Sequence, residues 1–411
     1  MSLQQTTHDV IISGAGPAGS TCALFLARKG RNVLVLEKST FPRDKICADN
    51  KTWKCMDIVK ELGLWKEFQK LSKAEIHGVL VASPAGNEIY TPLHPDDLKK
   101  KGPWYNVKRL LFDNMLASAA KKEKTVTFRE NCEVISPIWE NNQMVGVTYR
   151  DAKGKTHEAY AKAVVGADGS RSPIAESVGV SAHVQGRYAT NIRAYFEHVS
   201  GPMDRCQLYY LKGICPGYFW IFPVDKKTVN VGIGMRPEDI KKTGKSLQKV
   251  LNDTIASGRF ASRFKKAKQV SEWKEWGLSV LGKRRKCAGN GWVLCGDAGT
   301  FAMTYSGEGC GPSMRTGKIA ALAIDECLRN GNVSESGLRL YEENLWKILE
   351  PEVKGFRWLE FLLLNESVYD WVVKKAAKNP ELLDLSSRMQ NHYELSQEMV
   401  SPRTVIKLLF S

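Results

Sequence analysis

A short apolar run that ends in closely spaced glycines is the feature that most constrains the fold of this chain. Val10–Ser13 is rich in residues that favour β-strands. The glycines that follow have the spacing G-x-G-x-x-G and are Gly14, Gly16 and Gly19. Ala18–Lys29 then carries apolar residues at helical spacing, and Val33–Leu36 repeats the pattern of a buried strand and ends at Glu37. This order predicts a βαβ unit.

The same stretch predicts a dinucleotide site. The first glycine allows the tight turn, the second lets a pyrophosphate approach the backbone, and the third lets helix and strand pack closely. The phosphates are expected at the helix N-terminus, where free N–H groups and the helix dipole favour an anion. Glu37 is placed to accept hydrogen bonds from ribose hydroxyls. The candidate nucleotide ligands are Gly14, Gly16, Pro17, Ala18, Gly19, Glu37 and Lys38.

Size and composition are those of a globular protein with ample core. The chain has 411 residues, of which 43% are hydrophobic and 25% are charged. The ten cysteines show no C-x-x-C spacing and no associated histidine cluster, so neither a disulfide scaffold nor a metal site is expected. This usage suits a reducing cytoplasm. We expect no signal peptide and no membrane span, because charged and amide residues interrupt the most apolar stretch, Phe356–Val373.

The formal net charge of +16 is compatible with three kinds of surface. It is explained by a solvated basic surface, by attraction to anionic cofactors or substrates, or by peripheral contact with an anionic membrane face. A nucleic-acid partner is not expected, because no nucleic-acid-binding motif accompanies the charge.

Hydrophobic patterning indicates a discontinuous nucleotide-binding domain. We assign residues 1–75, 106–181 and 287–330 to it, residues 76–105 and 182–286 to a β-rich substrate domain, and residues 331–411 to a helical C-terminal segment that ends in the apolar tail Val405–Phe410. Helices are expected at 56–68, 107–120, 238–264 and 311–328, and a hairpin at 76–90. Three runs, 125–129, 132–139 and 143–150, look like strands of one small sheet.

Two further strands end in an acidic residue next to glycine. The first leads into Gly166-Ala-Asp168-Gly169, and the second leads into Gly296-Asp297, followed by the glycine-rich loop Gly307–Gly311. Together with the βαβ unit, these segments resemble the FAD-dependent group that contains p-hydroxybenzoate hydroxylase, flavin-dependent halogenases and geranylgeranyl reductases. The three motifs occur in the order of the family and span residues 8 to 315.

The resemblance implies the fold and further FAD contacts. The fold class is α/β, with a glutathione-reductase/p-hydroxybenzoate-hydroxylase-like Rossmann domain, an inserted antiparallel β-sheet substrate domain and a helical C-terminal segment. In the family, the carboxylate at the position of Asp297 binds the ribityl chain, and the glycine loop presents N–H groups to the flavin. By position, the implied FAD contacts are Cys47, Ala48, Arg109, Val134, Asp168, Asp297, Gly307, Gly309 and Cys310. For Arg109, an ordinary surface arginine is the alternative.

One motif favours a branch of the family. Tyr218, Trp220 and Phe222 lie in Y-x-W-x-F-P, followed by Gly232-Ile-Gly234, which is similar to the signature of geranylgeranyl reductases. Aromatic residues on successive strands can line an apolar tunnel for an isoprenoid, or they can form ordinary sheet core. The chain departs from the family at Gly299, Thr304, Ala175 and Glu176, and has Cys47-Ala48-Asp49 where reductases often have Cys-Gly-Gly.

The function implied is reduction of carbon–carbon double bonds in a polyprenyl lipid or diphosphate, with NAD(P)H or an electron carrier reducing FAD. Cys47 is the candidate catalytic residue, either as a proton donor or by tuning the flavin ring, although a lone cysteine is more often a small buried hydrophobe. The alternatives are an FAD-dependent aromatic monooxygenase or a flavin-dependent halogenase, and a lipid-binding escort that has lost its FAD contacts. We expect a cytoplasmic enzyme, with peripheral attachment to a membrane left open.

Overall fold

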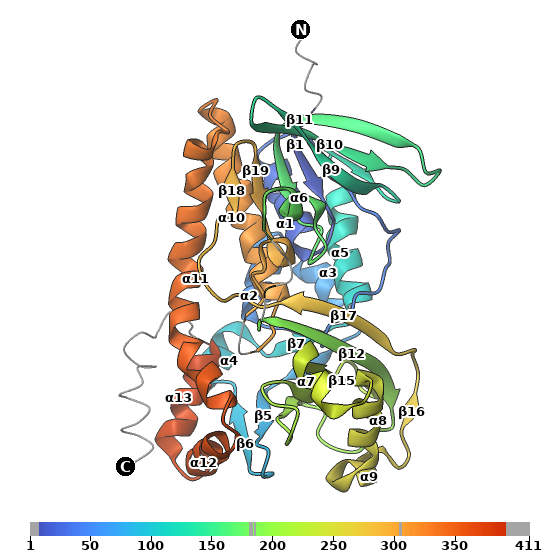
Figure 1. Ribbon diagram of the computed structural model, residues 1–411, viewed down its shortest axis with the longest axis vertical. Helices are drawn as coiled ribbons and strands as arrows, with labels where there is room; N and C mark the ends of the chain where they lie inside the picture. Colours follow the sequence, from blue (N-terminus) through green and yellow to red (C-terminus); the bar gives the residue numbers. More distant parts are fainter. Residues whose placement is uncertain (1–7, 181–183, 185, 304–305, 392–411) are drawn as a thin grey trace.

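The computed structural model describes residues 8–180, 184, 186–303 and 306–391 (Figure 1). Its side chains are described except for those of residues 352, 355–363 and 389–391. Thr304 and the predicted tail Val405–Phe410 lie outside the described residues.

The main sheet is built around the predicted βαβ unit. Its strand order is β18-β19-β11-β1-β2-β8, and the neighbours from β19 to β8 are parallel. The strands are β1 (His8–Ser13), β2 (Val33–Leu36), β8 (Val126–Arg129), β11 (Thr156–Gly166), β18 (Ala288–Gly289) and β19 (Trp292–Leu294). Both β1 and β2 end at the edge where β11 delivers Gly166, so the Gly-bounded acids meet at one edge of the sheet.

One strand prediction is wrong. The run at 125–129 forms β8, which pairs in parallel with β2 at the edge of the main sheet, whereas β9 (Glu133–Glu140) and β10 (Gln143–Arg150) form an antiparallel ribbon with the outer half of β11. Local alternation cannot distinguish the two partners, because pairing depends on the right-handed crossover through the helix at 109–121.

A second, largely antiparallel sheet lies below the main sheet in the view of Figure 1. Its order is β16-β12-β15-β14-β13-β5-β6, with β17 also paired to β12. The strands are β5 (Gly78–Ala82), β6 (Glu88–Pro92), β12 (Tyr188–Glu197), β13 (Arg205–Tyr209), β14 (Tyr218–Pro223), β15 (Thr228–Met235), β16 (Lys268–Gln269) and β17 (Lys274–Ser279). A third small sheet joins β3 (Asn50–Lys51), β7 (Trp104–Asn106) and β4 (Ala74–Ile76).

The helices pack around both sheets. They are α1 (Pro17–Arg28), α2 (Trp53–Glu61), α3 (Trp65–Gln69), α4 (Pro95–Lys101), α5 (Arg109–Lys121), α6 (Pro173–Ser177), α7 (Pro237–Thr243), α8 (Leu247–Ala256), α9 (Gly258–Phe264), α10 (Cys310–Arg329), α11 (Glu335–Leu363), α12 (Glu366–Ala376) and α13 (Pro380–Asn391). Two predicted helices are each broken. Gly63 separates α2 from α3 and Gly244 separates α7 from α8, both with positive φ.

The C-terminal helices connect the two sheets. Helix α11 runs along one side of the molecule and leads to α12 and α13, which pack beside β6 at the far end (Figure 1). Tyr369 and Val373 on α12 form one apolar cluster with Ile89 and Tyr210 of the second sheet. The fold is therefore the predicted α/β class, with a parallel Rossmann-like sheet, a second β-sheet and a helical C-terminal segment.

Candidate active site

A cavity of about 940 Å³ joins the edge of the main sheet to the second sheet. At one end it is lined by the β1–α1 turn and by the loop after β2, and at the other by β13, β14, α12 and α13. Of the candidate site residues derived from the sequence, all but Gly19 line this cavity. The geometry thus brings residues from distant parts of the chain to one site.

The β1–α1 turn shows why glycine is needed at its positions. Gly14 has a φ of +89°, and a Cβ there would lie 2.6 Å from the carbonyl oxygen of Ala167. A Cβ on Gly19 would overlap the carbonyl oxygen of Gly14, so this glycine serves the packing of α1 on β1 rather than the cavity wall. At Gly16 the nearest atom is Arg43 Nη2, 3.7 Å away, which leaves the approach to the N-terminus of α1 open.

Two carboxylates border this end of the cavity. Glu37 accepts hydrogen bonds from the backbone N–H of Ala15 (2.9 Å) and of Ser39 (3.0 Å), which fixes the side chain against the glycine turn. Asp168 accepts from the hydroxyl of Ser13 at 2.6 Å through Oδ2, while Oδ1 is buried without a hydrogen-bond partner among the described residues. Burial raises the pKa of Asp168 to about 6.

A further part of the wall is formed by the turn before α10 and by the start of that helix, which packs against the start of α1. Asp297 lies in the 3₁₀ turn Gly296–Gly299, and it lines the cavity together with Ser306, Gly307, Glu308 and Gly309. Helix α10 begins at Cys310 and runs for 20 residues, so its N-terminal dipole faces the cavity. Gly307 has a φ of +66°, which lets the chain turn into the helix.

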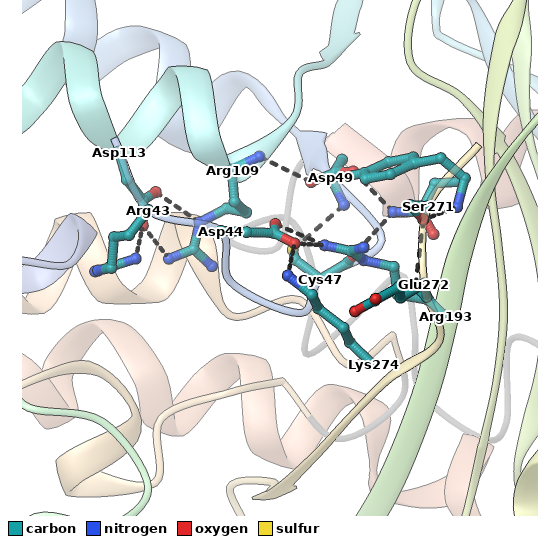
Figure 2. Close-up of polar contacts among 12 residues, drawn as sticks. Arg43, Asp44, Cys47, Asp49, Arg109, Asp113, Arg193, Ser271, Glu272 and Lys274 are labelled. Carbon is teal, nitrogen blue, oxygen red and sulfur yellow. Dashed lines mark hydrogen bonds and ion pairs between the residues drawn. The ribbon is translucent and has the colours of Figure 1, made fainter. Parts of the chain in front are cut away.

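Arg109 is not a surface arginine. Its guanidinium forms a two-pronged ion pair with Asp113 one turn along α5, at 2.6 and 2.7 Å, and Arg43 contacts the same carboxylate at 2.9 Å (Figure 2). Asp113 is fully buried, and Arg109 next to it lowers its pKa against the effect of burial. The pairing holds Arg109 at the cavity wall.

The loop after β2 is also tied to the second sheet. Arg193 of β12 is fully buried and forms two hydrogen bonds to Asp44, at 2.7 and 2.8 Å, and Lys274 of β17 contacts Asp44 at 3.1 Å (Figure 2). The loop is therefore held by one arginine–aspartate pair in each direction: its Asp44 pairs with Arg193 of β12, and its Arg43 pairs with Asp113 of α5.

Two cysteines, Cys47 and Cys310, also line the cavity. Burial raises the pKa of Cys47, so the thiol holds its proton at neutral pH, although its Sγ accepts the N–H of Asp49 at 3.3 Å. Cys310 differs: a hydrogen bond from Cys55, together with the positive charges of Lys51 and Arg109, lowers its pKa to about 7 against the effect of burial.

The aromatic motif forms the wall of an apolar compartment. Tyr218 donates its hydroxyl hydrogen bond to the carbonyl of Ser306 (2.8 Å), which links β14 to the glycine loop. Trp220 and Phe222 are buried and line the cavity, with Tyr218 packed edge-on against Trp220. Tyr210 extends this wall and packs edge-on against Tyr369 of α12, 5.1 Å between ring centroids.

Sequence reasoning missed two sets of cavity residues. The first is Lys45, whose Nζ lies 3.5 Å from the ring centroid of Trp276 and whose pKa burial lowers to about 7. The second comes from the C-terminal helices, which supply Leu364, Tyr369, Val373, Leu382 and Leu385. Helical periodicity in 366–391 was the available signal, but it shows only that one face is apolar and not what that face covers.

These residues fit a bound FAD. The open approach at Gly16 leads to the free N–H groups at the N-terminus of α1. Oδ1 of Asp168, which has no partner among the described residues, can accept a hydrogen bond from a ligand. The cavity is large enough for a ligand of the size of a cofactor. A β1–α1 glycine turn at the carboxyl edge of a parallel sheet is the geometry of dinucleotide-binding folds.

The fold and the site define a class: an FAD-binding α/β flavoprotein. Residues 7–348 match the family described as FAD binding domain, and the chain belongs to that family. It is accordingly an FAD-dependent oxidoreductase, and the resemblance to p-hydroxybenzoate-hydroxylase-like flavoproteins is confirmed.

Curated relatives are similar to this chain over most of its length. A digeranylgeranylglycerophospholipid reductase of Methanocella arvoryzae is 29% identical over 360 residues, covering 85% of this chain and 86% of the relative. A menaquinone reductase of Mycobacterium tuberculosis is 29% identical over 323 residues, covering 77% and 76%.

Solved structures share the fold over nearly the whole chain. A geranylgeranyl bacteriochlorophyll reductase-like protein of Thermoplasma acidophilum superposes with a TM-score of 0.82 at 21% identity, covering 98% of this chain and 99% of that one. The flavin-dependent brominase Bmp2 gives a TM-score of 0.79 at 23% identity, covering 98% and 97%. At these identities the likeness establishes the fold alone.

Proposed function

We propose that this oxidoreductase reduces carbon–carbon double bonds of a polyprenyl, geranylgeranyl-type lipid or diphosphate. The observation that carries the proposal is the apolar compartment that continues from the glycine loop at Ser306 to Tyr218, Tyr210 and Tyr369. An apolar chain of this kind needs a long, water-excluding wall. Two relatives named as reductases, one of them acting by name on a digeranylgeranyl lipid, support the same conclusion.

We propose that FAD is held by the residues that line the nucleotide end of the cavity. Glu37 would bind the ribose, the N-terminus of α1 the pyrophosphate, and Asp297 with the loop at Gly307 the flavin end. Asp168, Arg109, Val134, Cys47 and Ala48 would complete the walls. The FAD-binding domain would comprise residues 1–75, 106–181 and 287–330, the substrate domain 76–105 and 182–286, and the helical segment 331–411.

When bound, FAD supplies a two-electron carrier for hydride transfer to an alkene carbon. The residues of this chain would then supply the proton and exclude water from the alkene. Cys47 Sγ borders the cavity as a neutral thiol, because burial raises its pKa, so it can give its proton to the second alkene carbon. The buried rings of Trp220 and Phe222 would hold the chain and keep water out. The thiol would be reprotonated from solvent, and NAD(P)H or an electron carrier would supply the electrons.

We further propose a peripheral attachment to anionic membrane surfaces, where such lipids reside. Among the described residues, no helix has the length and apolar composition needed to cross a bilayer. Attachment would instead use the positive charge of the chain and the exposed apolar residues of α12, Val368 and Trp371.

Mass spectrometry of the products tests the proposed reaction. The holoenzyme is reduced with dithionite under anaerobic conditions and given geranylgeranyl diphosphate or a geranylgeranylated phospholipid, with reductant alone as the control. We expect mass gains in steps of one hydrogen pair only when enzyme is present. An unchanged lipid, together with an oxygenated or halogenated aromatic product once air is admitted, would overturn the proposal in favour of a monooxygenase or halogenase.

A further inference from the structure

Asn230 on β15 reaches across the site to the loop that bears Cys47. Its Nδ2 donates hydrogen bonds to the carbonyl oxygen of Cys47, at 2.6 Å, and to Oδ2 of Asp49, at 2.7 Å. Tyr195 on β12 donates its hydroxyl to the same carboxylate oxygen at 2.8 Å. The second sheet therefore holds this loop through one amide and one phenol, both buried.

The far side of the loop is held from the first part of the chain. Oδ1 of Asp49 accepts the backbone N–H of Arg109 at 3.0 Å (Figure 2). The buried ammonium of Lys51 donates to the carbonyl of Asp49 at 2.9 Å. Asp49 is fully buried and has a φ of +71°, a conformation that a non-glycine residue keeps only when its surroundings impose it. The hydrogen bonds on both sides of Asp49 impose this conformation.

Asn230 makes a third hydrogen bond, to Trp220 in the wall of the apolar compartment. Its Oδ1 accepts the indole N–H of Trp220 at 2.9 Å. A primary amide has two N–H donors and one carbonyl acceptor, and here each is used by a different partner, so the orientation of the Asn230 side chain is uniquely specified. Trp220 on β14 is 3% exposed and lines the cavity beside Tyr218.

We infer that Asn230 is a positioning residue that holds Cys47 at the cavity wall and couples its position to Trp220. If the indole bond is lost, the orientation of the amide is fixed less strongly, and its short hydrogen bond to the carbonyl of Cys47 weakens. Asp49, whose N–H contacts the Cys47 sulfur at 3.3 Å, would shift with it. The inference rests on the proposed placement of Cys47 beside FAD, but it does not depend on which substrate is reduced.

The experiment measures alkylation of Cys47 by iodoacetamide in the holoenzyme across a range of pH, followed peptide by peptide in a mass spectrometer. Trp220→Phe keeps an aromatic ring in the wall but removes the indole N–H together with part of the ring volume, a loss of volume that the control variant Trp104→Phe reproduces. Asn230→Leu removes all three bonds. Trp104→Phe is the matched control, because Trp104 lines the same cavity and its indole N–H has no hydrogen-bond partner among the described residues.

We expect the limiting alkylation rate at high pH to rise about threefold in Trp220→Phe and about tenfold in Asn230→Leu, as the loop opens more often. The apparent pKa of Cys47 should fall in both, because more frequent opening of the loop relieves the burial that raises it. Trp104→Phe should match the wild type in rate and pKa. Exchange of the Asp49 amide hydrogen provides a second readout and should accelerate in the same two variants.

Wild-type rates, pKa and amide exchange in Trp220→Phe would overturn the coupling to Trp220, and this variant alone decides the question if Asn230→Leu fails to fold. An equal change in Trp104→Phe would also overturn it, because the effect would then be general loosening. Since no lipid is present in these assays, a failure of alkene reduction would count against the proposed function and leave this result untouched.

Discussion

At the scale of single residues, the electrostatics of Lys45 are the most informative feature of the site. Burial lowers its pKa to about 7, Asp297 opposes that shift, and Arg109 and Arg43 add to it. Lys45 is therefore positively charged below pH 7 and loses its charge above it. Because FAD is an anion and Lys45 lines the proposed cofactor cavity, proton binding at Lys45 and FAD binding should support each other.

We predict that the FAD dissociation constant of the wild type increases about five- to tenfold between pH 6 and pH 8.5. Lys45→Arg keeps its charge over this range and should bind tightly throughout, whereas Lys45→Met should bind weakly throughout. Fluorescence titration of the FAD-free protein measures all three. Cys310 titrates in the same range, so the difference between wild type and Lys45→Arg isolates Lys45. Parallel pH profiles for these two proteins would contradict the prediction.

The place of a residue in the site could be predicted from the sequence where a short motif fixes it. It could not be predicted where the role of the residue depends on partners far away along the chain. Gly14 and Asp168 sit in short motifs whose spacing dictates their place at the sheet edge. Lys45 and Asn230 have no such motif. Their roles depend on Trp276 and Cys47, which lie more than 180 residues away along the chain and meet them only through packing of the second sheet on the loop.

At the scale of elements, the β1–α1 turn separates cofactor binding from folding. Gly16 and Gly19 belong to the same motif, yet a Cβ would make only an ordinary contact with the Arg43 side chain at the first and would overlap the backbone of Gly14 at the second. Gly16 has a φ of −66°, so alanine is not strained there. Only the ligand explains a need for glycine at Gly16, whereas the packing of α1 explains it at Gly19.

We predict that Gly16→Ala leaves the stability of the FAD-free protein within about 0.5 kcal/mol of wild type and weakens FAD binding at least about tenfold. Gly19→Ala, the paired variant, should lower the free energy of unfolding by about 2–3 kcal/mol, because the new methyl group forces α1 away from β1. Guanidinium denaturation and FAD titration measure the two effects. FAD binding of wild-type strength in Gly16→Ala would rule out a close approach of the pyrophosphate at this turn.

At the scale of the whole molecule, the hydrophobic pattern of the sequence was enough to predict the fold class. The pairing of some strands and the placement of the C-terminal helices depended on long-range packing. The βαβ unit and the aromatic strands follow from local periodicity, but the parallel pairing of β8 with β2 and the packing of α12 and α13 beside β6 do not. The missed C-terminal contribution matters most, since α12 closes the apolar compartment with Tyr369.

The same helix presents an exposed apolar row at the surface. Val368 and Trp371, three residues apart on α12, are each 37% exposed, and Leu364, which is 60% exposed, lies in the turn just before the helix. Leu364 also lines the cavity, so this row borders the apolar compartment. Lys374 and Lys375, in the last turn of α12, lie beside it. With a net charge of +16, this arrangement suits the surface of an anionic bilayer from which an isoprenoid lipid could enter.

We predict that the protein co-sediments with vesicles that contain phosphatidylglycerol but not with pure phosphatidylcholine vesicles. Binding should be lost in about 1 M salt, where the Debye length falls to about 3 Å. Trp371→Ser should weaken vesicle binding about five- to tenfold through loss of an interfacial ring. Trp139→Ser is the matched control, because Trp139 is 40% exposed on β9 at the opposite end of the molecule from α12 (Figure 1). Equal weakening by both substitutions would show that α12 does not direct the protein to the membrane, and absence of binding at low salt would exclude peripheral attachment altogether.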